Sequence, residues 1–88
     1  MKIKVKYFLE YARLSGCRDE EYFFENDELV SVKEVFKNLN SKYNIKYNDV
    51  ANKGIILVNN RSITQLDMEN TVLRDGDKLI IMPMNSGG

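Results

Sequence analysis

Apolar and polar residues alternate along the first segment of the chain. Residues 2–8 read Lys-Ile-Lys-Val-Lys-Tyr-Phe, the period of a strand with one face on a core. Residues 9–16 then form a connecting loop or a short helical turn, which Gly16 closes. Residues 20–25 carry three consecutive aromatic side chains, which favour a pleated surface. The pattern therefore predicts two strands joined by a short connection.

The apolar spacing becomes helical after residue 30. Ser31 is followed three residues later by Glu34, which is the pattern of a capping box. Val30 before the cap and Val35 in the first turn would form the accompanying hydrophobic staple. We expect a helix over residues 31–43 with one face on the core. That face comprises Val32, Val35, Phe36, Leu39 and Tyr43.

The second half of the chain contains shorter segments. Residues 44–53 are polar without a regular pattern, and we expect a loop there. Residues 54–59 are nearly all apolar, as in a strand buried on both faces. Residues 61–63 predict a short strand, and residues 66–73 an irregular stretch with room for a turn of helix. An Asp-Gly-Asp turn then precedes the final strand over residues 78–82.

This order of elements predicts a two-layer α+β domain. A helix that crosses between strands must cover one face of a mixed sheet. We expect the two most apolar strands at the centre of that sheet. Pro83 has no N–H and marks the end of the last strand. The domain would span residues 1–83, and residues 84–88 would form a flexible tail.

Composition excludes several classes of site. Thirteen basic residues balance thirteen acidic ones without a basic block, so we expect no nucleic-acid partner. With no histidine and one cysteine, the chain cannot build a histidine-dependent catalytic group or a structural zinc site. The sequence shows no glycine-rich phosphate loop, and we expect neither a signal peptide nor a membrane-spanning stretch. We expect a cytoplasmic protein with no catalytic site of its own and no bound cofactor or metal.

Three segments resemble the ubiquitin-like β-grasp sulfur carriers, and most of all the small subunit of molybdopterin synthase. The first is the opening strand with Leu14-Ser15-Gly16, and the second is the helix entry over residues 29–35. The third is the segment over residues 73–83, which is followed by Gly87-Gly88. The resemblance implies a β-grasp fold, a mixed sheet with one main helix packed on one face.

The resemblance also implies a reaction at Gly88. A ubiquitin-activating-like adenylyltransferase, using ATP and Mg, would adenylate its carboxylate, and sulfur would displace AMP to leave a thiocarboxylate. Gly87 and Gly88 lack side chains and could thread a narrow channel into a partner's active site. The large subunit of molybdopterin synthase, in a heterotetramer, would pass the sulfur to a pterin precursor. Cys17 is not needed and is expected to be a small loop residue.

The last strand also predicts a docking surface. Side chains alternate between sheet faces, so if Leu79 and Ile81 face the helix, Ile80 and Met82 point outward. We hypothesise that Ile80 and Met82 contact the activating enzyme and the large subunit. The alternative is that residues 44–53 cover this face and make both residues core. The remaining partner-binding residues would be Pro83, Met84, Asn85 and Ser86.

Other uses of the glycine end stay open. The same activated Gly88 would serve a ubiquitin-like modifier that is conjugated to lysines. A sulfur carrier could also supply thiamine synthesis or tRNA thiolation. An interaction domain in which the last residues have no role is a further possibility.

Overall fold

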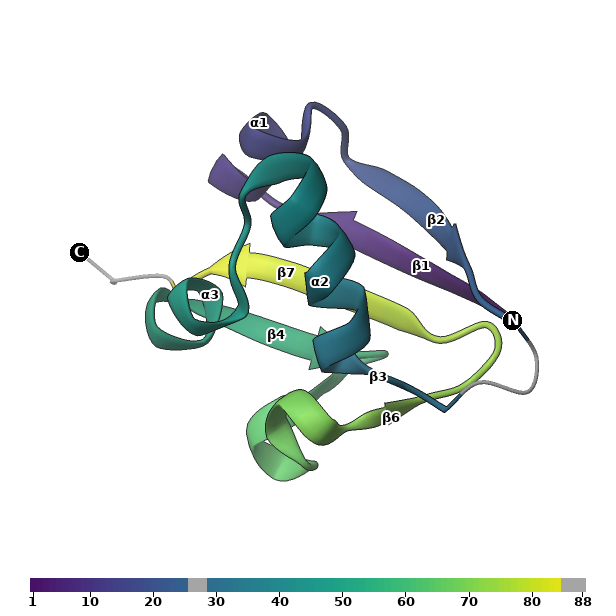
Figure 1. Ribbon diagram of the computed structural model, residues 1–88. Helices are drawn as coiled ribbons and strands as arrows, with labels where there is room; N and C mark the ends of the chain where they lie inside the picture. Colours follow the sequence, from purple (N-terminus) through teal and green to yellow (C-terminus); the bar gives the residue numbers. More distant parts are fainter. Residues whose placement is uncertain (26–28, 85–88) are drawn as a thin grey trace.

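A five-stranded mixed sheet forms one layer of the molecule, and helices lie against one of its faces (Figure 1). The computed structural model describes residues 1–25 and 29–84. The elements of the main sheet and its helices are β1 (Lys2–Tyr7), α1 (Glu10–Ser15), β2 (Asp19–Phe23), α2 (Val32–Tyr43), α3 (Tyr47–Lys53), β4 (Gly54–Val58), β5 (Arg61–Ser62) and β7 (Lys78–Pro83). A small second sheet pairs β3 (Val30–Ser31) with β6 (Val72–Leu73), and two 3-10 turns span Ile63–Gln65 and Met68–Asn70. This architecture confirms the predicted two-layer α+β domain.

The strand order of the main sheet is β2-β1-β7-β4-β5. β7 pairs in parallel with β1 and antiparallel with β4, so the last strand is hydrogen-bonded along both edges. The prediction that the most apolar strands are central holds, since β7 lies in the middle with β4 beside it. Because β1 and β7 run in parallel, their carboxyl ends meet at the same end of the sheet.

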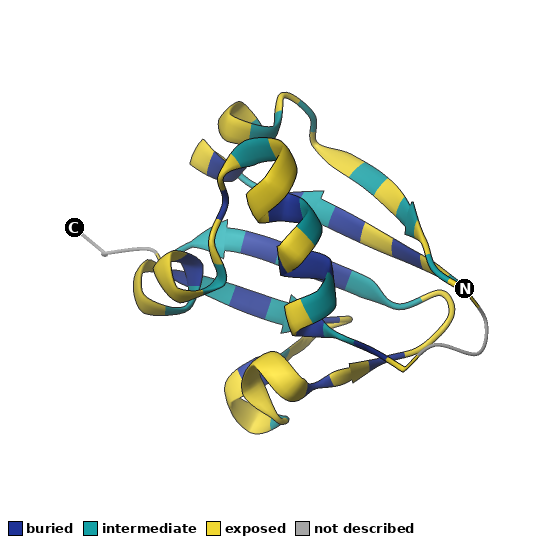
Figure 2. Ribbon diagram, viewed as in Figure 1, coloured by how far each residue is buried: buried dark blue, intermediate teal, exposed yellow. Residues whose placement is uncertain are grey.

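The core lies between the sheet and α2. Alternating residues of β1, namely Ile3, Val5 and Tyr7, are buried, as the period of two predicts. Val32, Val35, Phe36 and Leu39 bury the predicted face of α2, while Tyr43 at its end is half-buried. Figure 2 shows buried residues alternating with half-buried ones along β4 and β7. The helix ends at Asn44, which adopts a left-handed conformation with φ 59°.

The prediction of a loop over residues 44–53 is wrong. Seven of these residues form α3, although their sequence is mostly polar. Ile45 and Val50 are buried, and the ring of Tyr47 packs edge-on against Phe36 with centroids 5.4 Å apart. A helix this short is marginal in isolation. Burial of these side chains against α2 and the core stabilises it.

The capping box is also absent. α2 begins one residue after Ser31, as predicted, but the Ser31 side chain makes no capping hydrogen bond. Ser31 belongs to β3 and pairs with Val72 across the small sheet. The Glu34 carboxylate instead lies 3.2 Å from the Lys37 amino group. The Val30 and Val35 side chains expected to form the staple are both buried.

β4 is buried on one face, where we expected burial on both. Ile56 and Val58 lie in the core, whereas Ile55 and Leu57 are half-buried on the opposite face. No helix packs on that opposite face among the described residues, since α2 and α3 lie on the same side of the sheet (Figure 1). The helices of the described residues also lack the length and apolar character that a membrane crossing requires.

Candidate functional site

The last strand, β7, lies at the centre of the sheet, and the C-terminal residues of the chain follow it. Pro83 is the final residue of β7 and lies opposite Gly54 at the start of β4. The next residue, Met84, donates its backbone N–H to the carbonyl of Lys53 over 3.2 Å, and its side chain is 56% exposed. The predicted site residues Asn85, Ser86, Gly87 and Gly88 lie outside the described residues. Pro83, the last residue of β7 before this segment, is thus held in place by the pairing of β7 with β4.

Gly54 allows the two strands to approach closely at this point. A Cβ at Gly54 would lie 2.7 Å from the carbonyl oxygen of Met82 and 3.1 Å from the hydroxyl of Tyr11. The first distance is shorter than a carbon and a carbonyl oxygen tolerate, and the oxygen belongs to rigid backbone. The absence of a side chain at Gly54 therefore allows β4 and the end of β7 to lie this close together.

Ile80 and Met82 lie on the face of the sheet that points away from α2. Leu79 and Ile81 are fully buried on the helical side, so the predicted alternation along β7 is confirmed. In the register with β4, Ile80 lies opposite Leu57 and Met82 opposite Ile55. We call these four half-buried side chains, Ile55, Leu57, Ile80 and Met82, the apolar strip. The segment 44–53 does not cover it, because α3 packs against α2.

Two residues after β1, Phe8 and Leu9, lie at the same end of the sheet, and no pattern in the sequence marks them as part of a site. The Phe8 N–H donates to the carbonyl of Ile81 over 3.0 Å, which places Phe8 beside the end of β7. Leu9 has a φ of 52°, uncommon for a residue with a branched side chain, and is 76% exposed. The parallel pairing of β1 with β7 brings them there, and neither strand's sequence reveals that pairing.

A cavity of about 230 Å³ opens beside Met84. Its lining is mostly apolar and comprises Ala51, Gly54, Ile55, Ile56, Ser62, Ile63, Thr64, Met68 and Met84. The cavity extends the apolar surface from the strip to the base of the chain end.

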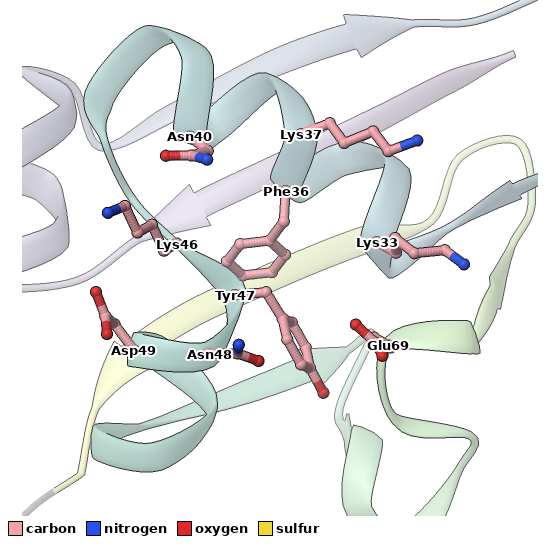
Figure 3. Close-up of a pocket in the computed structure, with 9 residues that line it drawn as sticks. All are labelled: Lys33, Phe36, Lys37, Asn40, Lys46, Tyr47, Asn48, Asp49 and Glu69. Atoms are coloured by element: carbon pink, nitrogen blue, oxygen red, sulfur yellow. The ribbon is translucent and has the colours of Figure 1, made fainter.

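A larger cavity of about 460 Å³ lies on the helical face, between α2 and α3 (Figure 3). Phe36 and Tyr47 lie at its centre, and lysine, asparagine and acidic side chains surround them. Figure 3 shows the Lys33 and Lys37 side chains extending away from these two rings. The rim mixes three lysines with Asp49 and Glu69, so it does not favour a ligand of one charge.

One carboxylate on the helical side of the sheet accepts hydrogen bonds from four side chains. Glu20 of β2 accepts hydrogen bonds from the hydroxyls of Tyr7 (2.5 Å), Tyr43 (3.0 Å) and Tyr22 (3.1 Å) and from the Lys42 amino group (3.0 Å). Burial alone would raise the pKa of Glu20, but these hydrogen bonds outweigh it and hold the pKa below its ordinary value. Burial and the bond to Glu20 raise the pKa of the Tyr7 hydroxyl. The cluster ties β1 and β2 to the end of α2.

Cys17 makes local contacts. Its thiol lies 3.7 Å from the hydroxyl of Ser15, and the residue is half-buried. Among residues 1–25 and 29–84, no group of three or more cysteine, aspartate and glutamate side chains is placed to hold a metal ion.

The ThiS family model matches residues 5–88 of the chain. The chain belongs to the ThiS family of ubiquitin-like sulfur carriers. The match covers all but four residues at the start and extends to the two glycines that sequence analysis singled out. A search of curated protein sequences found no match.

Solved structures show that this family member has the ubiquitin-like β-grasp fold. The small archaeal modifier protein 1 of Methanosarcina acetivorans is 25% identical, with a TM-score of 0.80 over 99% of this chain and 96% of that one. Urm1 of Trypanosoma brucei is 15% identical, with a TM-score of 0.77 over 99% and 95%. A third similar structure is the complex of subunits 1 and 2 of the molybdopterin-converting factor of Helicobacter pylori. The matched chain of that complex is 24% identical, with a TM-score of 0.66 over 100% of each chain.

Proposed function

We propose that this chain is the small subunit of a molybdopterin synthase and carries sulfur as a thiocarboxylate on Gly88. The observation that carries the proposal is the family match, which includes Gly87 and Gly88, together with the short stretch of sequence that separates them from Pro83, the last residue of the central strand β7. A complex of two molybdopterin-converting factor subunits among the similar structures supports a partner subunit. The chain would act in the cytoplasm as a carrier, with the catalytic groups on its partners.

The reaction begins with activation. A carboxylate with a pKa near 3.5 is ionised at neutral pH and is a poor electrophile, so it must first be converted to a mixed anhydride with phosphate. The Gly88 carboxylate attacks the α-phosphate of ATP on a ubiquitin-activating-like enzyme, and pyrophosphate leaves. A sulfide equivalent then attacks the acyl carbon, AMP leaves, and a thiocarboxylate remains. Mg and ATP belong to the activating enzyme.

The fold holds Pro83 and Met84, the residues that precede the chain end, in a defined position. β7 is paired along both edges, and the Met84 N–H is bonded to Lys53, so the base of the tail is positioned before the partner binds. A pre-positioned base lowers the ordering cost of binding. We propose that Ile80, Met82, Pro83 and Met84, continuing into Asn85 and Ser86, contact the activating enzyme and the large subunit.

Intact-mass measurement tests the proposal. After incubation with the activating enzyme, ATP and a sulfide source, the chain should gain the mass of one oxygen-to-sulfur exchange, located at Gly88 by fragmentation. A variant without Gly88 should gain none, while a Cys17→Ser variant should gain as much as the wild type. The exchange located at Cys17, or absent altogether, would refute the carrier proposal.

A second function has one observation in its favour. The archaeal relative with a TM-score of 0.80 is a small modifier protein, and a modifier would use the same activated glycine. In that case lysates of the native host should contain covalent adducts of this chain that survive denaturation and reduction and require Gly88. The carrier proposal expects free chain and a non-covalent complex instead. Carriers for thiamine synthesis or tRNA thiolation would show the same mass shift but a different sulfur acceptor.

A further inference from the structure

The strand β2 lies at one edge of the main sheet, where β1 is its neighbour (Figure 1). Even-numbered residues face β1 at both ends of this pairing. The Arg18 carbonyl accepts a hydrogen bond from the end of β1 over 2.8 Å, and the Phe24 N–H donates to the Met1 carbonyl over 2.8 Å. Successive residues of a strand direct their N–H and C=O groups to opposite sides. The outward backbone groups therefore belong to the odd-numbered residues of β2, which are Asp19, Glu21 and Phe23.

The fold leaves these outward backbone groups without a partner. Within the part of the chain that the structure describes, no second strand pairs with β2, and the three N–H and three C=O groups form no hydrogen bond. The side chains of the same residues stand on the outer face, because Glu20 contacts α2 on the helical side. A strand laid against this edge would complete both the hydrogen bonds and a row of side-chain contacts.

Each of the three outward side chains favours a cation beside it. Asp19 forms no ion pair among residues 1–25 and 29–84, and Glu21 pairs with Lys2 at 3.4 Å while its side chain stays 41% exposed. Phe23 is 72% exposed, and the face of an aromatic ring attracts an ammonium or guanidinium group. Opposite charges on neighbouring strands stabilise their pairing. A strand with lysine or arginine at alternate positions thus matches this edge.

The lysines of β1 weaken this preference without reversing it. Lys4 lies opposite Glu21 and Lys6 opposite Asp19, on the same outer face. Because neighbouring strands are about 4.8 Å apart, a strand added to β2 would lie about 5 Å from the carboxylates and about 10 Å from the lysines. The Debye length at about 0.1 M salt is also about 10 Å, so the more distant repulsion is screened more strongly. Attraction to the carboxylates therefore outweighs it.

A second copy of this chain fits the edge poorly. In a two-fold antiparallel pairing of β2 with its copy, residues with outward backbone groups lie opposite each other. Every register that pairs Glu21 with residue 19, 21, 23 or 25 of the copy then places two carboxylates opposite each other, drawn from Asp19, Glu21 and Glu25. Like charges directly opposite destabilise a strand pair. The acidic edge disfavours self-pairing and accepts a segment of the opposite charge.

We propose that the outer edge of β2 binds an extended segment of another protein that carries lysine or arginine at alternate positions. The segment adds a strand to the sheet through main-chain hydrogen bonds to Asp19, Glu21 and Phe23. Its basic side chains meet the two carboxylates and the aromatic ring, and the residues between them pack beside Tyr22 on the helical side. Because β1 separates β2 from β7, the bound segment leaves the chain end accessible. The inference does not depend on the proposed function.

Peptide binding tests the inference. The probe is a fluorescein-labelled octapeptide of alternating lysine and valine, measured by fluorescence anisotropy, and the control is an octapeptide of alternating glutamate and valine. We expect the lysine peptide to bind about tenfold more tightly at low salt, and the difference to shrink as salt screens the charges.

Amide hydrogen exchange locates the bound peptide. In the free chain the amides of Asp19, Glu21 and Phe23 should exchange fast, and saturating lysine peptide should slow them by at least about tenfold. The amides of Glu20 and Tyr22 pair with β1 and should be protected with and without peptide. An alternating pattern of new protection along β2 is the signature of an added strand.

Two variants separate the backbone from the charge. Glu21→Pro removes an outward N–H and keeps the hydrogen bonds to β1, and proline is tolerated at such edge positions. It should bind the lysine peptide at least about threefold more weakly than Glu21→Ala, which loses only the carboxylate. Asp19→Asn/Glu21→Gln keeps every N–H and should bind about fivefold more weakly than wild type. The matched control Asp49→Asn/Glu69→Gln, at the rim of the larger cavity, should stay within about twofold.

Several outcomes would overturn the inference. These are equal affinities for the two peptides, no binding of the lysine peptide up to about 1 mM, or full affinity in both Glu21→Pro and Asp19→Asn/Glu21→Gln. New protection at amides outside β2 would also refute it. A concentration-dependent dimer in sedimentation that Glu21→Pro abolishes would assign the edge to a second copy and refute a basic segment as its partner. Circular dichroism and thermal midpoints establish that each variant is folded.

Discussion

Replacing Glu20 with alanine removes the one acceptor that four donors share. The Tyr7 hydroxyl loses most, because Tyr7 is only 2% exposed and water does not replace the carboxylate there. An unpaired buried donor costs about 1–3 kcal/mol. The hydroxyls of Tyr22 and Tyr43 belong to half-buried residues and can turn to water. The half-exposed Lys42 pair adds at most about 1 kcal/mol.

The expected loss of unfolding free energy for Glu20→Ala is therefore about 1–4 kcal/mol. For a domain of this size that corresponds to a fall in the thermal midpoint of roughly 5–25 °C. Thermal and urea unfolding followed by circular dichroism would measure it. Glu21→Ala is the matched control, since Glu21 is the next residue, lies on the opposite face, and among residues 1–25 and 29–84 forms an ion pair with half-exposed Lys2 alone. That variant should lose less than about 0.5 kcal/mol.

The pH dependence of the unfolding free energy tests the role of Glu20 in a second way. The pKa of Glu20 lies below its ordinary value in the folded chain, so the unfolded chain binds the proton more tightly. The carboxylate therefore stabilises the fold above the ordinary glutamate pKa of about 4.3, and this contribution is lost as the pH falls through the folded-state pKa. The stability difference between wild type and Glu20→Ala should narrow accordingly in acid.

A double-mutant cycle tests the structural assignment directly. In a Tyr7→Phe background no buried hydroxyl is left unpaired, so Glu20→Ala should cost about 1–2 kcal/mol less than in the wild type. Equal losses for Glu20→Ala and Glu21→Ala, or purely additive effects of Glu20→Ala and Tyr7→Phe, would refute the reasoning.

Three further predictions concern the end of β7 and the thiol of Cys17. Gly54→Ala places a Cβ against the Met82 carbonyl and should cost about 1–3 kcal/mol in unfolding free energy; an unchanged urea midpoint would contradict this. Met82→Glu should lower stability by less than about 1 kcal/mol and weaken binding to the activating enzyme, because the contact would have to desolvate a charge. Val72→Glu on β6 is its control, and equal binding by both variants argues against the docking surface. Cys17→Ser should leave the rate of thiocarboxylate formation unchanged, and a rate loss would give the thiol a role.

Local patterns in the sequence determined the elements that bury a regular face. The alternation over residues 2–8 specifies β1, and the helical spacing after Ser31 specifies α2, because one apolar face must reach the core in each. The same alternation placed Ile80 and Met82 on the outer face. The resemblance carried by the glycine end and the last strand indicated the β-grasp fold and the family.

Tertiary structure decided what depends on partners far apart in the chain. α3 is short and mostly polar, and it forms because Tyr47 and Val50 pack on a neighbouring helix and core. Ser31 makes no capping hydrogen bond with its side chain, and its backbone pairs with Val72 of β6, a strand far along the sequence. The hydrogen bond between Tyr43 and Glu20 joins residues 23 positions apart in the sequence, and the pairing of Lys4 with Lys78 joins residues 74 positions apart. No local period encodes such contacts, because they follow from strand order, and strand order is set by how the whole core closes.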